Sequence, residues 1–107
     1  MGFHESVVPQ VFDGKIVTWR LRDHKFQKGD IVVFENSQTG KIFGFGEIVE
    51  SLITTVGEIN LKDKNHYKTY ENREDLIEAF KKHNPNYEVN RDTSVFVYKY
   101  RFKQQIK

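Results

Sequence analysis

The segment from Thr93 to Lys103 limits the possible folds of this chain more than any other, because two kinds of side chain alternate along it. One set of alternate positions carries large rings, namely Phe96, Tyr98, Tyr100 and Phe102. The intervening positions are first aliphatic and then basic, with Lys99, Arg101 and Lys103. Since successive side chains of a strand point to opposite faces, the pattern predicts a long strand whose rings fill a core. The basic face is available for phosphate contacts by Lys99 and Arg101, although solubility of an exposed strand explains it equally well.

Three further segments are predicted to be strands. Residues 15–22 (KIVTWRLR) alternate apolar and polar side chains, and Trp19 lies on the apolar side, where we expect it to join the core. Residues 31–35 and 41–52 flank the loop NSQTG, whose final glycine is typical of a hairpin. Two glycines inside the second hairpin strand indicate a bulge, a bend or the close approach of another group, at Gly44 and Gly46.

One main helix is predicted over about residues 72–83. Asn72 can cap it through the side-chain oxygen, acidic residues follow in the first turn, and Pro85 forbids its continuation. Before the first strand, residues 5–8 predict a short extended segment, and Pro9 favours one helical turn before the chain reaches Gly14.

Length and composition restrict the class of protein. A chain of 107 residues fits one domain, residues 1–107, and the complete lack of cysteine excludes disulfides, thiolate metal sites and cysteine nucleophiles. The four histidines show no metal-binding spacing, so we expect neither a metal nor another cofactor. No apolar run approaches the roughly 20 residues that span a bilayer. We therefore expect a soluble, cytoplasmic protein without a membrane partner, of undefined oligomeric state.

The small net charge of +2 hides two basic segments. Residues 15–28 carry five basic side chains against one acidic side chain, and residues 99–107 carry four against none. If the two segments pair in a sheet, they would form one positive face on a nearly neutral protein. Several short strands, one late helix and a closing strand predict an α+β fold, with a curled, mostly antiparallel sheet that forms a small barrel.

The first basic segment contains a motif with a familiar pattern. Residues 14–30 contain G-K-x-x-T-W-R-L-x-D-H-x-F-x-K-G-D, which begins at Gly14 and ends at Asp30. This pattern resembles the opening signature of ASCH domains, and the likeness continues through the hairpin, the approach to the helix and the last strand. The resemblance implies a small PUA-like β-barrel with a cleft beside the signature strand, in a superfamily associated with RNA binding and modified-base recognition.

A weaker likeness points to one bacterial branch of that family, an amidohydrolase that removes the acetyl group of N4-acetylcytidine. The catalytic lysine and threonine of that branch correspond by motif position to Lys15 and Thr18. Its third catalytic residue is a glutamate shortly before the helix, where this chain has Tyr70, with Glu71 adjacent and Glu74 one turn on. A lysine of lowered pKa can activate a threonine hydroxyl. Positions three apart on a regular strand face opposite sides, so the pair meets only if Lys15 lies in the preceding loop or a bulge intervenes.

Four more side chains are predicted to line the same cleft. Arg20 and Arg22 share the Thr18 side of their strand and suit the bidentate binding of a phosphate or carboxylate, while an ordinary solvated face explains them equally well. His66 and Tyr70 lie in the loop before the helix, where a histidine can hydrogen-bond a base or simply anchor the loop. The favoured hypothesis is a module that binds RNA or a modified nucleoside. The alternative is a cofactor-free amidohydrolase using Lys15, Thr18 and one of the two glutamates.

Overall fold

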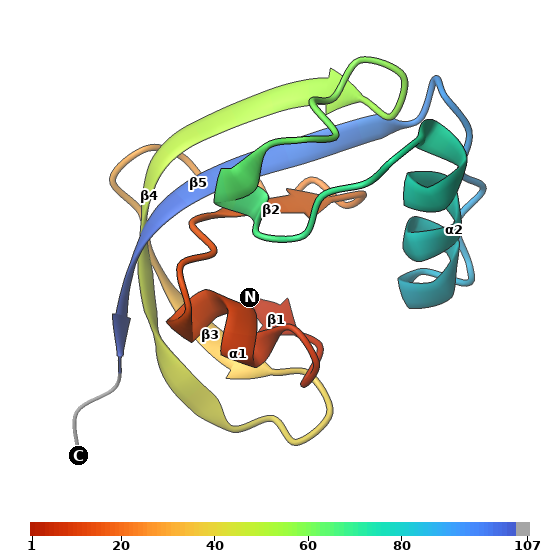
Figure 1. The fold of residues 1–107 in the computed structure, drawn as a ribbon. Coiled ribbons are helices and arrows are strands. Elements are labelled where there is room, and N and C mark those ends of the chain that lie inside the picture. Colours follow the sequence, from red (N-terminus) through yellow and green to blue (C-terminus); the bar gives the residue numbers. More distant parts are fainter. Residues whose placement is uncertain (105–107) are drawn as a thin grey trace.

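The computed structural model describes residues 1–104, so Lys107 of the basic C-terminal segment lies outside the described residues. Five strands and three short or medium helices follow one another along the chain (Figure 1). In order they are β1 (Gly2–Phe3), α1 (Val8–Phe12), β2 (Val17–Arg20), β3 (Ile31–Asn36), β4 (Ile42–Thr55), the 3₁₀ helix η1 (Lys64–His66), α2 (Arg73–His83) and β5 (Ser94–Gln104). The α+β class and the single main helix predicted from the sequence are confirmed.

All five strands form one sheet in the order β1-β3-β4-β5-β2. The pair β1–β3 is parallel and the other three pairs are antiparallel. β4 and β5 bend strongly, so the sheet curls around α1 and β1 (Figure 1). Its two edge strands, β1 and β2, are joined by a side chain, because Arg20 Nη1 donates to the Gly2 carbonyl at 2.7 Å. The sheet is therefore a partly closed barrel, with Arg20 across the opening.

The ring-bearing face of β5 packs inside the curl. Tyr98 and Tyr100 are each 1% exposed and lie among residues of β1, β3, β4 and α1. The rings of Phe34 and Tyr100 meet edge to face at 4.8 Å. A Cβ atom added to Gly46 would collide with the Phe34 ring, so the bare strand position predicted at this glycine admits a core ring of the neighbouring strand. The prediction that the alternating rings of the last strand fill the core is confirmed.

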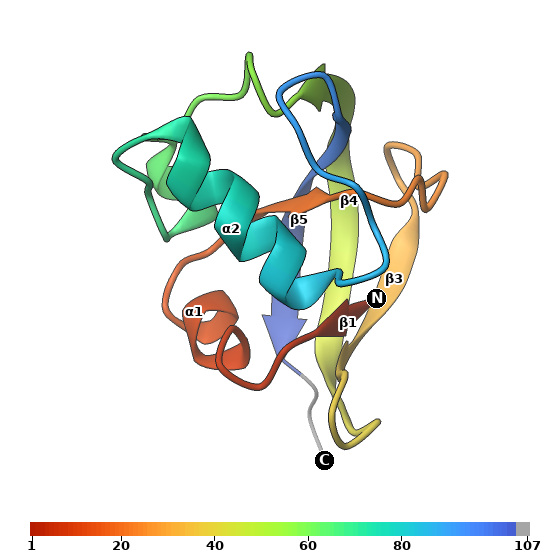
Figure 2. The ribbon, with the colours of Figure 1, turned by 90° about the vertical axis from the view of Figure 1, so that its right-hand side faces the viewer.

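A second core cluster lies on the opposite face of β2 and β5. Trp19 and Val95 pack there against Leu76 and Phe80 of α2, which crosses in front of these strands in Figure 2. The helix begins where the sequence predicts, because the Asn72 side chain accepts a hydrogen bond from the Asp75 amide at 2.9 Å. The two clusters leave β2 with core on both faces and one free edge.

Two local predictions are wrong. Residues 5–8 do not form a strand, because the His4 carbonyl accepts hydrogen bonds from the amides of Val7 and Val8 and starts a turn that leads into α1. The first signature strand covers only Val17–Arg20 rather than residues 15–22.

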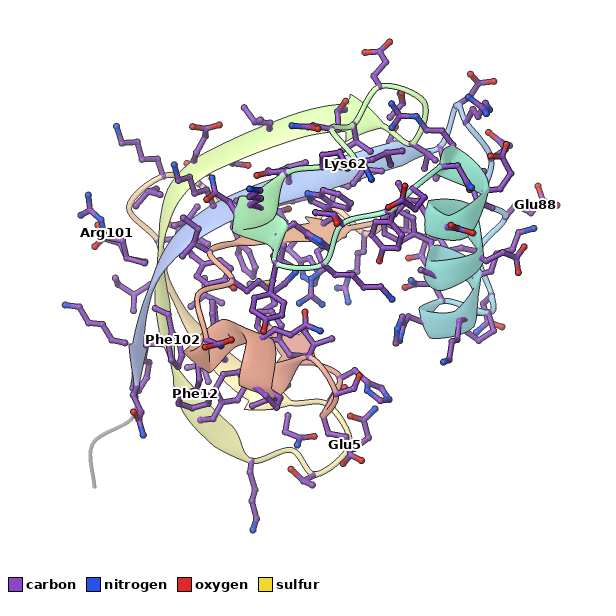
Figure 3. The ribbon with its side chains drawn as sticks, viewed as in Figure 1. Glu5, Phe12, Lys62, Glu88, Arg101 and Phe102 are labelled. Atoms are coloured by element: carbon purple, nitrogen blue, oxygen red, sulfur yellow. The ribbon has the colours of Figure 1, made fainter. Side chains whose placement is uncertain are left out.

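The two basic segments do pair, through β2 and β5, yet they form no single positive face. Thr18 lies opposite Tyr98 and Arg20 lies opposite Phe96, so Arg20 shares the face that carries the rings. Lys99 and Arg101 occupy the alternate positions and face the other way, and Figure 3 shows Arg101 projecting outward from β5. Because side chains alternate along each strand, Arg20 lies on one face of the sheet, and Lys99 and Arg101 lie on the other.

Candidate functional site: a cationic cleft at the free edge of β2

A cleft of about 400 Å³ opens along the free edge of β2. The segment from Gly2 to Gln10 forms one wall, and α2 with the residues that follow η1 forms the other. Figures 1 and 2 show α1 and α2 on different sides of β2. The volume falls in the range of small-molecule sites, which is about 300–1,000 Å³.

Apart from the hydroxyls of Tyr98 and Tyr100, the buried polar side chains of residues 1–104 all belong to this cleft. These side chains are Lys15, Thr18 and His66, which are 3%, 4% and 9% exposed and all line it. Burying polar groups costs free energy unless each finds a partner, and each of the three has a hydrogen bond here. The cleft is the part of the chain where the sequence departs from a simple apolar core.

Lys15 reaches the cleft because it lies in the loop that precedes β2. Its Nζ donates to the His66 carbonyl at 2.8 Å, and its own carbonyl accepts from the Tyr100 hydroxyl at 2.8 Å. Burial and, next, the positive charge of Arg20 lower the pKa of Lys15 to about 7, while Asp63 opposes this shift more weakly. Near neutral pH the amine therefore exists in both protonation states.

Arg20 is fixed from three sides. Its Nε donates to the Thr18 hydroxyl at 3.0 Å, its Nη1 donates to Gly2, and its guanidinium lies 4.7 Å from the centre of the Phe3 ring. Burial lowers the pKa of Arg20 to about 10, so the group stays charged at neutral pH. Neither Nη2 proton has a partner among the described residues. Among residues 1–104, every fully buried side-chain nitrogen or oxygen has a hydrogen-bond partner. Because Nη2 has none, it is not fully buried and is accessible to solvent in the cleft.

His66 is held as a neutral ring. Burial, and next the charge of Lys15, lower its pKa to about 3. Its Nδ1 lies 3.0 Å from the Lys68 carbonyl, which only accepts, so Nδ1 carries the proton and Nε2 is left as an acceptor. The ring stacks on Trp19 with centroids 3.7 Å apart. The cleft thus presents an aromatic wall with one nitrogen acceptor.

The edge of β2 adds backbone groups to this wall. The Tyr100 amide donates to the Ile16 carbonyl, which fixes the alternation of the β2–β5 ladder. In an antiparallel pair every second residue turns its N–H and C=O away from the partner strand. Trp19 is such a residue, and because β2 ends the sheet, its backbone donor and acceptor point toward the cleft. Side by side, they match the paired donors and acceptors on the edge of a nucleobase.

Among the described residues, the lysine and arginine side chains that line the cleft are not balanced by any carboxylate in its walls. Lys15, Arg20 and Lys68 line it, and no Asp or Glu side chain of residues 1–104 does. Both glutamates named by the amidohydrolase likeness lie elsewhere, on the surface. The Glu71 carboxylate is 3.1 Å from Lys62 Nζ, and the Glu74 carboxylate is 3.0 Å from Arg91 Nη2.

The remaining predicted residues divide into two groups. Tyr70 lines the cleft, 6.2 Å from Trp19 between ring centroids. Arg22 is exposed and does not line it, and Lys99 and Arg101 lie on the far side of the sheet. Sequence reasoning missed Lys68 and the edge role of Trp19. No local sequence signal identifies Lys68 as a cleft residue. The free backbone groups of Trp19 follow only if the signature strand is known to be an edge strand.

Residues 1–104 offer neither a metal site nor a membrane-spanning helix. They contain no group of three or more His, Cys, Asp or Glu side chains that could hold a metal ion. No helix in the same range is long and apolar enough to cross a membrane.

Comparison with known proteins supports the fold. No family model and no curated protein matches the chain by sequence. Protein EF3133 from Enterococcus faecalis V583, a DUF984 structure, is similar with a TM-score of 0.67 and 12% identity over 90% of this chain and 69% of that chain. A mutant of ZmASCH from Zymomonas mobilis is similar with a TM-score of 0.63 and 12% identity over 94% of this chain and 65% of that one. The chain therefore has an ASCH-like fold.

Proposed function

We propose that this chain is an ASCH-type, PUA-like module that binds RNA or a modified nucleoside in the cleft beside β2. One observation carries the proposal: the buried side chains of Lys15, Thr18 and His66 line one cleft, which also contains an aromatic wall and a free strand edge. The Trp19 backbone and the neutral His66 ring offer hydrogen bonds to the edge of a base. Tyr70 and the cations supply stacking and charge.

The fold likeness adds to this proposal. The similar structure of ZmASCH, named as an ASCH protein, covers 94% of this chain. The signature motif of residues 14–30 supplies Lys15, Thr18 and Arg20, which the fold brings together in the cleft.

Trp19 provides the assay, because it is the single tryptophan of the chain and stacks on His66 inside the cleft. Titration with short single-stranded RNA, cytidine and N4-acetylcytidine at low salt should change its fluorescence. RNA affinity should fall as salt increases. Tyr70→Ala should weaken binding, and the matched control Tyr87→Ala, at an exposed tyrosine outside the cleft, should leave it unchanged. No binding of any of these probes at low salt would overturn the proposal.

A second candidate is an amidohydrolase acting on N4-acetylcytidine-type nucleosides. It is favoured by the placement of Lys15 and Thr18 in one cleft, with the amine able to accept a proton near neutral pH. The Thr18 oxygen would attack the acetyl carbon, its proton would pass to Lys15, and Lys15 would give the proton to the departing amine of cytidine. A water molecule would then hydrolyse the acetyl-Thr18 ester, which releases acetate and restores the hydroxyl. Neither glutamate lies in the cleft to assist.

The enzymatic candidate has a direct test. The wild-type chain should convert N4-acetylcytidine to cytidine and acetate, and Thr18→Val should abolish the reaction while preserving the side-chain volume. Absence of turnover in the wild type would exclude this candidate. Turnover that survives in Thr18→Val would exclude Thr18 as its nucleophile.

A further inference from the structure

The charges of the cleft have no counter-charge in its walls. Lys15, Arg20 and Lys68 line it without any carboxylate. Two arginines outside the cleft have partners within the protein. Arg91 forms an ion pair with Glu74, and Arg73 donates to two backbone carbonyls. A half-buried cation without an anion is expensive, because a medium less polar than water solvates it poorly. Asp63 acts on Lys15 only weakly and does not line the cleft, so a bound anion would supply the negative charge that the walls lack.

Arg20 is built to meet such a charge. Thr18 and Gly2 occupy Nε and one position on Nη1, and Phe3 covers the guanidinium, so the fork has a fixed orientation. Nη2 has no partner among the described residues and is accessible from the cleft. A guanidinium that is immobilised while part of its fork stays free is preorganised to bind an oxyanion.

Lys15 lines the same cleft as Arg20 and has donors to offer the same oxyanion. Its Nζ has one hydrogen-bond partner, the His66 carbonyl, which leaves the protonated amine with two free N–H groups. The charge of Arg20 is the second cause of its lowered pKa, so the two cationic groups act on each other in the empty cleft. An anion between them would replace this repulsion with two attractions.

We propose that the cleft binds its nucleoside-type ligand through a phosphate group, which lies between Arg20 Nη2 and Lys15 Nζ. This proposal rests on the proposed function, because phosphate is the oxyanion that RNA and nucleotides carry. The ligand is therefore a nucleotide or an RNA phosphate with its neighbouring base, rather than a free neutral nucleoside. The phosphate meets the cations while the base meets Trp19 and the ring acceptor of His66.

The test compares matched pairs on the full chain. Each of the four ribonucleosides is titrated beside its 5′- and 3′-monophosphate, with Trp19 fluorescence as the signal. For at least one base, a monophosphate should bind about tenfold more tightly than the nucleoside, which is the scale of one charge-assisted interaction. Arg20→Gln should remove this preference. The matched control Arg22→Gln, which loses the same charge from an exposed position outside the cleft, should retain it.

Each outcome has a separate meaning. Equal affinity for nucleoside and monophosphates in the wild type would overturn the phosphate site and leave the proposed function standing. Binding of neither would overturn both. If Arg20→Gln and Arg22→Gln reduce the preference for the monophosphate equally, only the overall charge matters. That result would also overturn the phosphate site. Because Arg20 links the two sheet edges, Lys15→Met serves as a second variant: it should reduce the preference for the monophosphate without removing the Arg20–Gly2 bond.

Discussion

Replacing Lys15 with methionine should stabilise the protein at neutral pH, although it removes a hydrogen bond. The ammonium group is held in a site where burial and Arg20 lower its pKa from 10.5 to about 7. In the unfolded chain the same group is fully hydrated and keeps its ordinary pKa. Between these two values the unfolded state binds more protons than the folded state, so the free energy of unfolding rises with pH in this window.

The magnitude follows from the two pKa values. Each pKa unit corresponds to about 1.4 kcal/mol, so holding Lys15 in the fold costs roughly 4 kcal/mol at pH 7 and roughly 2 kcal/mol at pH 9. Methionine has a similar length and no charge, so it removes this cost. It also leaves the His66 carbonyl without its partner, which costs about 1–3 kcal/mol. The net expectation is a stabilisation of about 1–3 kcal/mol at pH 7 that disappears as the pH approaches 9.

Urea unfolding at several pH values between about 7 and 9 measures the effect, with the wild type and Lys15→Met compared at each pH. Only the difference between the two proteins is interpreted, because other groups that titrate in this range contribute equally to both. The wild type should gain about 2 kcal/mol relative to the variant across the window. A difference that does not change with pH would refute the reasoning, since it would mean that Lys15 has the same pKa in both states.

Three further changes test the fold and the site. Asn72→Ala removes the cap that accepts the Asp75 amide and should cost about 0.5–2 kcal/mol in urea unfolding. Gly46→Ala places a methyl group against the Phe34 ring and should destabilise the fold by about 1–3 kcal/mol; an unchanged melting temperature would contradict this packing. The lowered pKa of His66, about 3, gives stability that is complete above pH 6.5 and is lost as the pH falls toward 3. His66→Phe should reduce the loss of unfolding free energy between pH 6.5 and about 3. If the wild type and the variant lose the same unfolding free energy over this range, His66 is not a neutral buried ring.

Local patterns predicted the elements whose determinants lie within a few residues. The Asn72 cap and Pro85 bracket the helix, the loop NSQTG joins the hairpin, and the alternating rings of residues 96–102 identify the long strand. In each case one residue type at one spacing is enough to specify the backbone or the buried face.

The rest depends on contacts between distant segments. β1 is only Gly2–Phe3, and it exists because β3 pairs with it in parallel, a partner that no local pattern reveals. The cleft likewise combines the loop before β2 with residues that follow η1, as the bond between Lys15 and His66 shows. The glutamates near the helix could not be placed from sequence, because a small rotation of the chain decides whether a carboxylate enters the cleft or pairs with a surface cation.

The cost of Lys15 to stability and its role in phosphate binding have opposite dependences on pH. Raising the pH from about 7 to 9 stabilises the folded protein, because protonation of the Lys15 amine, which favours the unfolded state, becomes less favourable as the pH rises. The same change removes the proton that attracts a phosphate, so affinity for a nucleotide should fall while stability rises. If Lys15 were purely structural and Arg20 alone bound the phosphate, stability would still change with pH, but affinity would not, because the Arg20 pKa of about 10 keeps that group charged. If the free energy of unfolding rises with pH while nucleotide affinity falls, both effects are assigned to the Lys15 amine. If affinity rises together with the free energy of unfolding, Lys15 is not the group that binds the phosphate.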